Sequence, residues 1–298
     1  MPLEDYIINA FCLIDDLYKE ILTSNKIRKS GYAPILLDSE IITMLIVGEF
    51  LSLDDDKKIW LHFKSSYLAL FPNLEQIRYK VFNKQSNHLW NVVRIIHSKL
   101  LNKIGTWNLY LADGLPLPLC HYARANKSKL FKDKAVKYFC AAKNERYYGL
   151  KILLVTTESG IPIDYAVDSA NIDERILLTE TSVPANATII ADKGFIGKDF
   201  ANNLKEQANI NLLTPLRKNM TEQIPAKLSK LIVTVRKRIE TTLSQLTEKF
   251  NLNKTKVRSF HGLLGRINRK ILSYTVALFF NYQIVKDQFT QLEHLIQA

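Results

Sequence analysis

The spacing of hydrophobic residues changes near residue 105. Before it, apolar residues recur at intervals of three and four, as between Leu3 and Leu17, which is the period of an amphipathic helix. Further helices are predicted over 41–51, 74–82 and 89–101, each preceded by polar residues suited to a helix start. Residues 1–104 are therefore expected to form an all-helical domain.

After Gly105 the pattern favours strands. Trp107, Leu109 and Leu111 alternate with more polar residues and lead into Asp113. Further strands are predicted over 147–157, 161–167, 188–191 and 210–214, and helices over 173–178, 198–207, 232–250 and 263–285. The turn at 159–160 is short enough to require an antiparallel hairpin. Three antiparallel strands followed by two crossover units match a ribonuclease-H-like fold, so residues 105–298 are predicted to form an α/β mixed-sheet catalytic domain.

Charge changes this picture by suggesting a partner. The chain carries 41 Lys and Arg against 29 Asp and Glu, a net charge of +12. Nine basic residues lie between Cys120 and Lys151, and 14 lie between Leu216 and Lys270. Such clustering is typical of proteins that bind nucleic acid. A merely basic surface is the alternative. Neither stretch has the strongly apolar face that a membrane-bound helix needs.

The remaining composition excludes several classes. The three cysteines form no close pair, and the six histidines lack zinc-ligand spacing. The N-terminus lacks the basic-then-apolar order of a signal peptide, and the longest strongly apolar segment, 271–280, is too short to span a bilayer. We therefore expect a cytoplasmic protein without a disulfide framework.

Two aspartates end predicted strands. In the expected topology, the strands that lead to Asp113 and Asp192 lie side by side, so their carboxylates meet at one edge of the sheet. Glu240 lies on the 232–250 helix, at the border of an apolar stripe. Oxygen ligands without His or Cys suit Mg²⁺ or Mn²⁺. Two such ions about 4 Å apart would stabilise an in-line displacement at phosphorus.

Each of these residues also has a structural interpretation. An aspartate at the end of a strand is often a turn former or a helix cap, and glycines follow both Asp113 and Asp192. Glu240 comes four residues after Arg236, a spacing that also suits a surface ion pair. Their joint occurrence at three topologically related positions favours a catalytic site.

Four short motifs carry a family resemblance. They are Leu111-Ala112-Asp113-Gly114, Tyr147-Tyr148-Gly149-Leu150-Lys151, Ala170-Asn171-Ile172-Asp173 and Ala191-Asp192-Lys193-Gly194-Phe195. Together with 37–43 they resemble bacterial insertion-sequence transposases of the Asp-Asp-Glu type, and most closely the insertion-sequence family numbered 982. The resemblance spans about residues 1–285.

The resemblance implies a function and assigns the carboxylates. Asp113, Asp192 and Glu240 match the family's three metal-binding residues, with Glu248 as the nearest substitute for Glu240. The chemistry implied is hydrolytic nicking at transposon ends, followed by attack of the freed 3′ hydroxyl on target DNA. Terminal inverted repeats would be held in a paired complex by a homodimer, in the bacterial nucleoid. Alternatives are a nuclease of the same fold that does not join strands and an inactive DNA-binding relic.

One signature is incomplete. Related families carry Tyr, Arg, Glu and Lys around the third carboxylate, but here the Tyr and Lys positions hold Val233 and Thr247. Arg238 or Lys249 is a candidate to replace the missing contacts. We expect DNA contacts from a group of basic residues, five of them in a loop beside the site: Lys127, Lys129, Lys132, Lys134, Lys137, Lys193, Arg236, Lys237 and Arg238.

The helical region offers a second DNA contact. Residues 76–84, which include Arg78, Lys80 and Lys84, are a candidate recognition segment for the inverted repeats. The alternative is that these helices brace the sheet or form a dimer interface.

Overall fold

The computed structural model describes residues 1–24, 27, 33–140, 144–215, 225–254, 257–285, 292 and 295. They form two compact units: Met1–Gly105 with Glu248–Ala298 (unit 1), and Thr106–Thr247 (unit 2). The sequence analysis placed all residues from 105 to 298 in one domain. In the structure the C-terminal helix instead belongs with the N-terminal helices.

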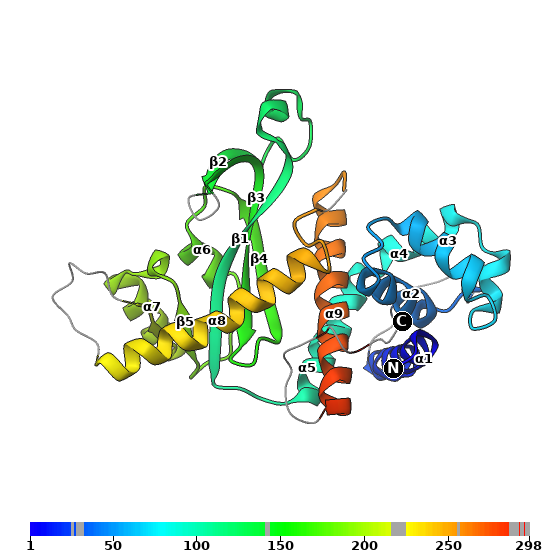
Figure 1. The fold of residues 1–298 in the computed structure, drawn as a ribbon, viewed down its shortest axis with the longest axis horizontal. Coiled ribbons are helices and arrows are strands. Elements are labelled where there is room, and N and C mark those ends of the chain that lie inside the picture. The colour runs from blue at the N-terminus through cyan, green and yellow to red at the C-terminus, as the bar shows by residue number, and fades with distance from the viewer. Residues whose placement is uncertain are drawn as a thin grey trace. The chain divides into compact units, whose positions relative to one another are not determined.

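Unit 1 is helical. Its elements are α1 (Leu3–Ser24), α2 (Asp38–Phe50), α3 (Asp56–Ser66), the 3-10 helix η1 (Pro72–Gln76), α4 (Tyr79–His88), α5 (Trp90–Ile104) and α9 (Phe260–Val285). Every residue of α2 is buried, and α9 packs against α2 and α5 (Figure 1). The single helix predicted over 74–82 is wrong, because Ile77 and Arg78 are extended between η1 and α4. Helix α3 was not predicted.

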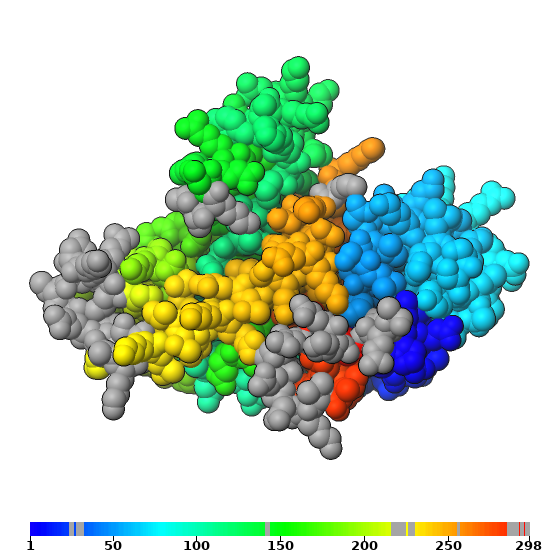
Figure 2. Space-filling view, in the orientation of Figure 1, coloured from blue at the N-terminus to red at the C-terminus, as the bar shows by residue number. Residues whose placement is uncertain are grey.

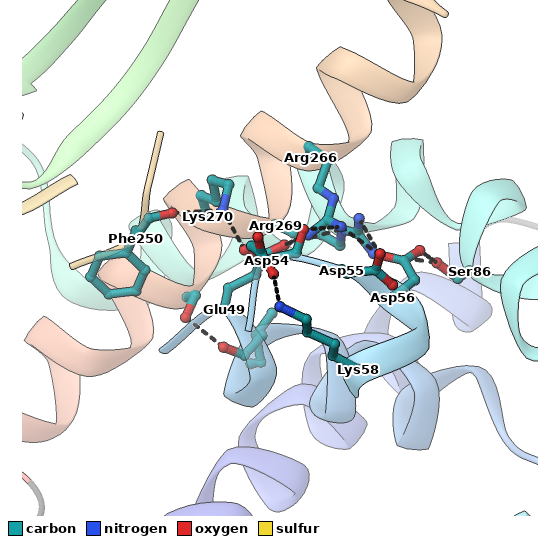
Figure 3. Close-up of polar contacts among 12 residues, drawn as sticks. Glu49, Asp54, Asp55, Asp56, Lys58, Ser86, Phe250, Arg266, Arg269 and Lys270 are labelled. Carbon is teal, nitrogen blue, oxygen red and sulfur yellow. Dashed lines mark hydrogen bonds and ion pairs between the residues drawn. The ribbon is translucent and has the colours of Figure 1, made fainter. Parts of the chain in front are cut away.

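A buried ionic network fastens α9 to the N-terminal helices (Figure 3). Arg266 donates to Glu49 over 2.8 Å and pairs with Asp56 at 3.1 Å. Arg269 also binds Asp56, at 3.0 Å, and Lys270 pairs with Glu49. Because a charge removed from water is stable only when paired, the network fixes how α9 packs within unit 1.

Unit 2 is built on a six-stranded mixed sheet. The strands are β1 (Leu109–His121), β2 (Val136–Cys140), β3 (Glu145–Thr157), β4 (Pro162–Ser169), β5 (Thr188–Ala191) and β6 (Asn211–Leu213). The order is β2-β3-β1-β5-β6, and β4 also pairs with β3. The β1–β3 and β3–β4 pairs are antiparallel, whereas β1–β5 and β5–β6 are parallel. These pairings confirm the predicted hairpin and crossovers.

Helices complete unit 2. The short helices are η2 (Tyr122–Lys127), α6 (Glu174–Thr179) and η4 (Lys193–Phe195), and the longer ones are α7 (Lys198–Ala208) and α8 (Ala226–Glu248). Tyr110 and Ala112 share one core with the apolar residues of α6 and α7. Side chains alternate along a strand, so Asp113 faces the other side of β1. Figure 1 shows α8 running across the sheet, with Thr242 donating to the Gly160 carbonyl at the β3–β4 turn.

Two strand predictions are wrong. β1 does not end at Asp113 but continues to His121, although the glycine after Asp113 suggested a turn. β2 lies within what was predicted to be a loop. Pro116 and Pro118 are tolerated because the pairing of β1 with β5 ends at Ala112. Beyond that point this edge of β1 has no neighbouring strand, so the missing N–H of a proline removes no hydrogen bond there.

Among the helices that the structure describes, none is long and apolar enough to cross a membrane.

Candidate active site

Asp113 and Asp192 each come directly after the last matched pair of residues in the parallel β1–β5 ladder. Ala112 lies opposite Ala191 in that pair, and each alanine immediately precedes one of the aspartates. The Asp113 Oδ1 atom accepts the Gly114 N–H at 2.8 Å, and Asp192 Oδ1 accepts the Lys193 N–H at 2.6 Å. The expected juxtaposition of the two strands is confirmed. Asp192 also caps η4, so its structural interpretation as a helix cap is confirmed.

The Asp113 carboxyl lies in an electrostatically unfavourable position. Burial is the main cause that raises its pKa, from 3.8 to about 6. The Gly114 N–H and the Arg236 guanidinium oppose this rise, whereas the charges of Glu174 and Asp192 add to it. Asp192 is more open to solvent, with 46% of its side chain exposed. Carboxylates crowded and partly desolvated in this way would gain from a cation beside them.

Arg236 links Asp192 to Glu240. One guanidinium nitrogen lies 3.2 Å from Asp192 Oδ1, and the other lies 3.8 Å from Glu240 Oε1. Arg236 is mostly buried, with 15% of its side chain exposed, whereas Glu240 is 56% exposed. Within the described part of the chain, no three His, Cys, Asp or Glu side chains are grouped to hold a metal ion. Glu240 is therefore connected to Asp192 through Arg236.

Glu174 is a carboxylate near the site that the sequence analysis missed. It lies in the first turn of α6, capped by the Asp173 side chain. A Cβ atom on Gly114 would overlap Glu174 Oε1, and one on Gly194 would lie 3.3 Å from Oε2. The glycines that follow Asp113 and Asp192 thus leave room for this carboxylate. Their recurrence after both aspartates was the available signal, but it was interpreted as turn chemistry.

The basic residues between β1 and β3 lie on a projecting arm rather than in a loop beside the site. We define the arm as residues 115–140 and 144–149, formed by the ends of β1 and β3 with η2 and β2; it stands out from the rest of unit 2 (Figures 1 and 2). Asp113 pairs with Leu154 of β3, whereas Lys137 pairs with Tyr148, six positions away. At about 3.3 Å per residue this separation is roughly 20 Å along the strand.

The arm's lysines differ in their contacts. Lys127, Lys129 and Lys132 are exposed. Lys134 pairs with Asp168 at 3.6 Å, and Lys137 donates to Asn126 at 2.7 Å. The first three are the ones best placed to meet a phosphate backbone.

The remaining predicted DNA contacts lie closer to the carboxylates. Lys193, in η4, and Lys237, on α8, are exposed. Arg238 is partly buried, and its aliphatic stem lies where a Cβ on Gly160 would be. Arg236 is engaged with Asp192 and Glu240. Of the α8 residues, Lys237 is thus the more accessible candidate for a DNA contact.

Comparison with known proteins identifies the family. The model of the transposase DDE domain matches residues 105–260, which include Asp113, Asp192 and Glu240. The chain belongs to this family. Comparisons with curated proteins and with solved structures gave no match. The resemblance to Asp-Asp-Glu insertion-sequence transposases is thereby confirmed, whereas the narrower assignment to the family numbered 982 stays a prediction.

Proposed function

We propose that this transposase cuts DNA at the ends of a mobile element and joins the freed 3′ ends to target DNA, using Asp113, Asp192 and Glu240. The observation that carries the proposal is the position of Asp113 and Asp192, each directly after the last matched pair of the parallel strands β1 and β5, in a transposase DDE domain. The element order supports a ribonuclease-H-like sheet, in which neighbouring strand ends bring catalytic groups together.

The donor chemistry fits a hard divalent cation. Members of this family generally use divalent metal ions. Asp113 is partly desolvated beside like charges, and oxygen ligands of this kind prefer Mg²⁺ or Mn²⁺. Asp113, Asp192 and Glu240 would hold two such ions, which when bound neutralise phosphate charge and lower the pKa of an attacking water.

The protein's own residues supply position and charge. Asp113 is fixed by its strand and by the Gly114 N–H, so its carboxylate needs no reorganisation during the reaction. Arg236 holds Asp192 and Glu240 within reach of one guanidinium and offsets their repulsion. The attacking oxygen forms a new bond to phosphorus as the bond to the leaving 3′ oxygen breaks, so strand transfer exchanges one phosphodiester for another.

We assign the reading of transposon ends to unit 1. Lys80, Lys84 and His88 are exposed at four-residue intervals along α4, while Phe82 and Ser86 are buried. One face of α4 thus offers positive and hydrogen-bonding groups, as a helix that enters the major groove would. Because two ends must be held together, the active form is proposed to be a homodimer on DNA.

The proposal is tested by assaying cleavage and strand transfer in Mg²⁺ on DNA that carries the inverted repeats flanking the gene. Asp113→Asn and Asp192→Asn should each reduce both steps by at least roughly 100-fold, because several kcal/mol of charge stabilisation is lost. Glu240→Gln should do the same, and Glu248→Gln, two turns further along α8, is the matched control. Salt-sensitive DNA binding should persist in all four variants.

Each rival function has its own outcome. Cleavage without joined product would identify a nuclease instead of a strand-transfer enzyme. DNA binding without any cleavage by the unaltered protein would identify an inactive relic. Full activity of Asp113→Asn and Asp192→Asn would overturn the assignment of the site.

A further inference from the structure

A third carboxylate occupies the gap that opens where β5 ends beside β1. β5 stops at Ala191, whereas β1 continues past Asp113, so the pairing of the two strands ends directly before the aspartates. The Glu174 carboxylate lies at this gap, with one oxygen against the Cα of Gly114 and the other against Gly194. A single side chain from α6 thus lies against Gly114, the residue after Asp113, and against Gly194, two residues after Asp192.

The fit depends on the two glycines. At Gly114 a methyl group would overlap the carboxylate, and at Gly194 it would lie 3.3 Å from it, tighter than an ordinary van der Waals contact. Neither glycine needs a left-handed backbone here, since both lie outside the positive-φ residues of the described chain. Conformation therefore does not require glycine at these positions, and room for Glu174 is the constraint that the structure offers.

Glu174 also has a countercharge. Lys151 Nζ lies 3.3 Å from Glu174 Oε1 and donates to the Ile172 carbonyl at 3.2 Å. Lys151 is 12% exposed and Glu174 is 25% exposed, so the pair is only partly solvated. If Glu174 had only a structural role, this ion pair with Lys151 would account for it fully. A carboxylate has two oxygens, however, and Oε2 faces Gly194 on the side of Asp192.

We propose that Glu174 is a further cation-binding residue of the active site and acts with Asp113 and Asp192. The inference rests on the proposed cation site. Family membership independently indicates a divalent ion at this site, and three carboxylates match the ligand chemistry of Mg²⁺ or Mn²⁺. On this view two helices each supply a carboxylate to the cation site: α6 supplies Glu174 and α8 supplies Glu240.

Mn²⁺ binding to the full-length protein without DNA tests the inference, measured by calorimetry and by the electron paramagnetic resonance signal of free Mn²⁺. Glu174→Gln should weaken binding at least about tenfold, the smallest effect expected when a residue supporting a metal site is lost. Glu180→Gln is the matched control, because Glu180 is exposed and follows the same helix. It should bind Mn²⁺ as the unaltered protein does.

The outcomes separate this inference from the proposed function. If Asp113→Asn and Asp192→Asn weaken Mn²⁺ binding but Glu174→Gln behaves like Glu180→Gln, Glu174 is only the partner of Lys151 and the inference fails alone. If neither aspartate variant changes Mn²⁺ binding, the proposed cation site fails and the inference fails with it.

A second variant keeps the test decisive if Glu174→Gln does not fold. Lys151→Gln removes the positive charge beside Glu174 but keeps its carboxylate. If that carboxylate binds the cation, Mn²⁺ should bind several-fold more tightly, because a competing charge has gone. Unchanged or weaker binding in a folded Lys151→Gln protein would overturn the inference.

Discussion

At the scale of single residues, the charged form of Asp113 that the proposed function needs is the form that burial disfavours. Its pKa is raised to about 6, chiefly by burial, so the native state favours the neutral carboxyl. A carboxyl with a raised native pKa favours folding when protonated at low pH, and this contribution is lost as the pH rises through about 6. At pH 8 the buried charge therefore destabilises the protein.

Asp113→Asn should consequently stabilise the metal-free protein. A shift of about two pKa units corresponds to about 3 kcal/mol, so we expect a gain of about 1 to 3 kcal/mol at pH 8 that disappears by pH 4. Urea unfolding in a chelator at the two pH values measures this gain. Asp133→Asn, at an exposed position on the arm, should show no such pH dependence. A loss of stability in Asp113→Asn at pH 8 would contradict the argument.

The residues of the site were unequally predictable from sequence. Asp113 and Asp192 could be singled out because a strand pattern leads into each of them. The register between β1 and β5 then sets how close they lie. Glu174 was missed because its proximity depends on the space left by two glycines distant in sequence. Glu240 was predicted to lie on a helix, and the structure places it on α8, but its link to Asp192 through Arg236 depends on how α8 crosses the sheet.

At the scale of elements, the spacing of apolar residues predicted a strand or helix correctly where a single periodicity dominates the segment. The bounds predicted for the strand that ends at Ala191 match those of β5, because its residues are apolar and short turns flank it. β2 was missed, since three of its five residues are exposed and it includes a lysine. Its pairing with β3 comes from the hairpin geometry of the arm and not from an apolar face.

The arm gives an element-scale prediction about DNA affinity. Replacing Lys127, Lys129 and Lys132 by Ala should weaken DNA binding irrespective of sequence, because phosphate contacts carry no base information. If all three meet phosphates, the slope of log affinity against log salt should fall by about 2.7, or 0.9 per contact. Fluorescence anisotropy with a labelled duplex at several salt concentrations measures both quantities.

A matched control for the arm lies on α3. Lys57 is exposed, and Lys58 pairs with Asp54 at 2.8 Å, so acidic neighbours surround both lysines. Replacing Lys57 and Lys58 by Ala should leave the salt slope nearly unchanged. An equal slope for the arm variant and the unaltered protein would exclude the arm from the DNA interface.

At the scale of the whole molecule, the chain leaves unit 1 for the sheet and returns to it. α9 follows α8 in sequence, yet its buried face is completed by α2 and α5, more than 150 residues earlier. The C-terminal helix was predicted to belong to the catalytic domain, because its apolar pattern shows that it is buried but not which helices bury it. The matching charges on α2, α3 and α9 become informative only once these helices are adjacent.

The buried network therefore predicts where unit 1 is most sensitive. Glu49 is 1% exposed and pairs with both Arg266 and Lys270. Glu49→Gln leaves these cations without their carboxylate in a site that excludes water. Breaking a buried pair in this way costs about 3 to 5 kcal/mol. Trp60 and Trp90 lie in unit 1 and Trp107 in unit 2, so tryptophan fluorescence in a Trp107→Phe background follows the unfolding of unit 1.

Comparison with an exposed pair in the same unit completes this prediction. Glu20 and Lys103 pair at 2.8 Å with 44% and 43% of their side chains exposed. Water screens such a pair, so Glu20→Gln should cost far less stability than Glu49→Gln. In urea, with a slope of about 2 kcal/mol per molar, Glu49→Gln should lower the midpoint by roughly 1.5 to 2.5 M and Glu20→Gln by much less. Equal shifts would mean that the buried network does not hold α9 in place, and that apolar packing against α2 and α5 alone makes the C-terminal helix part of unit 1.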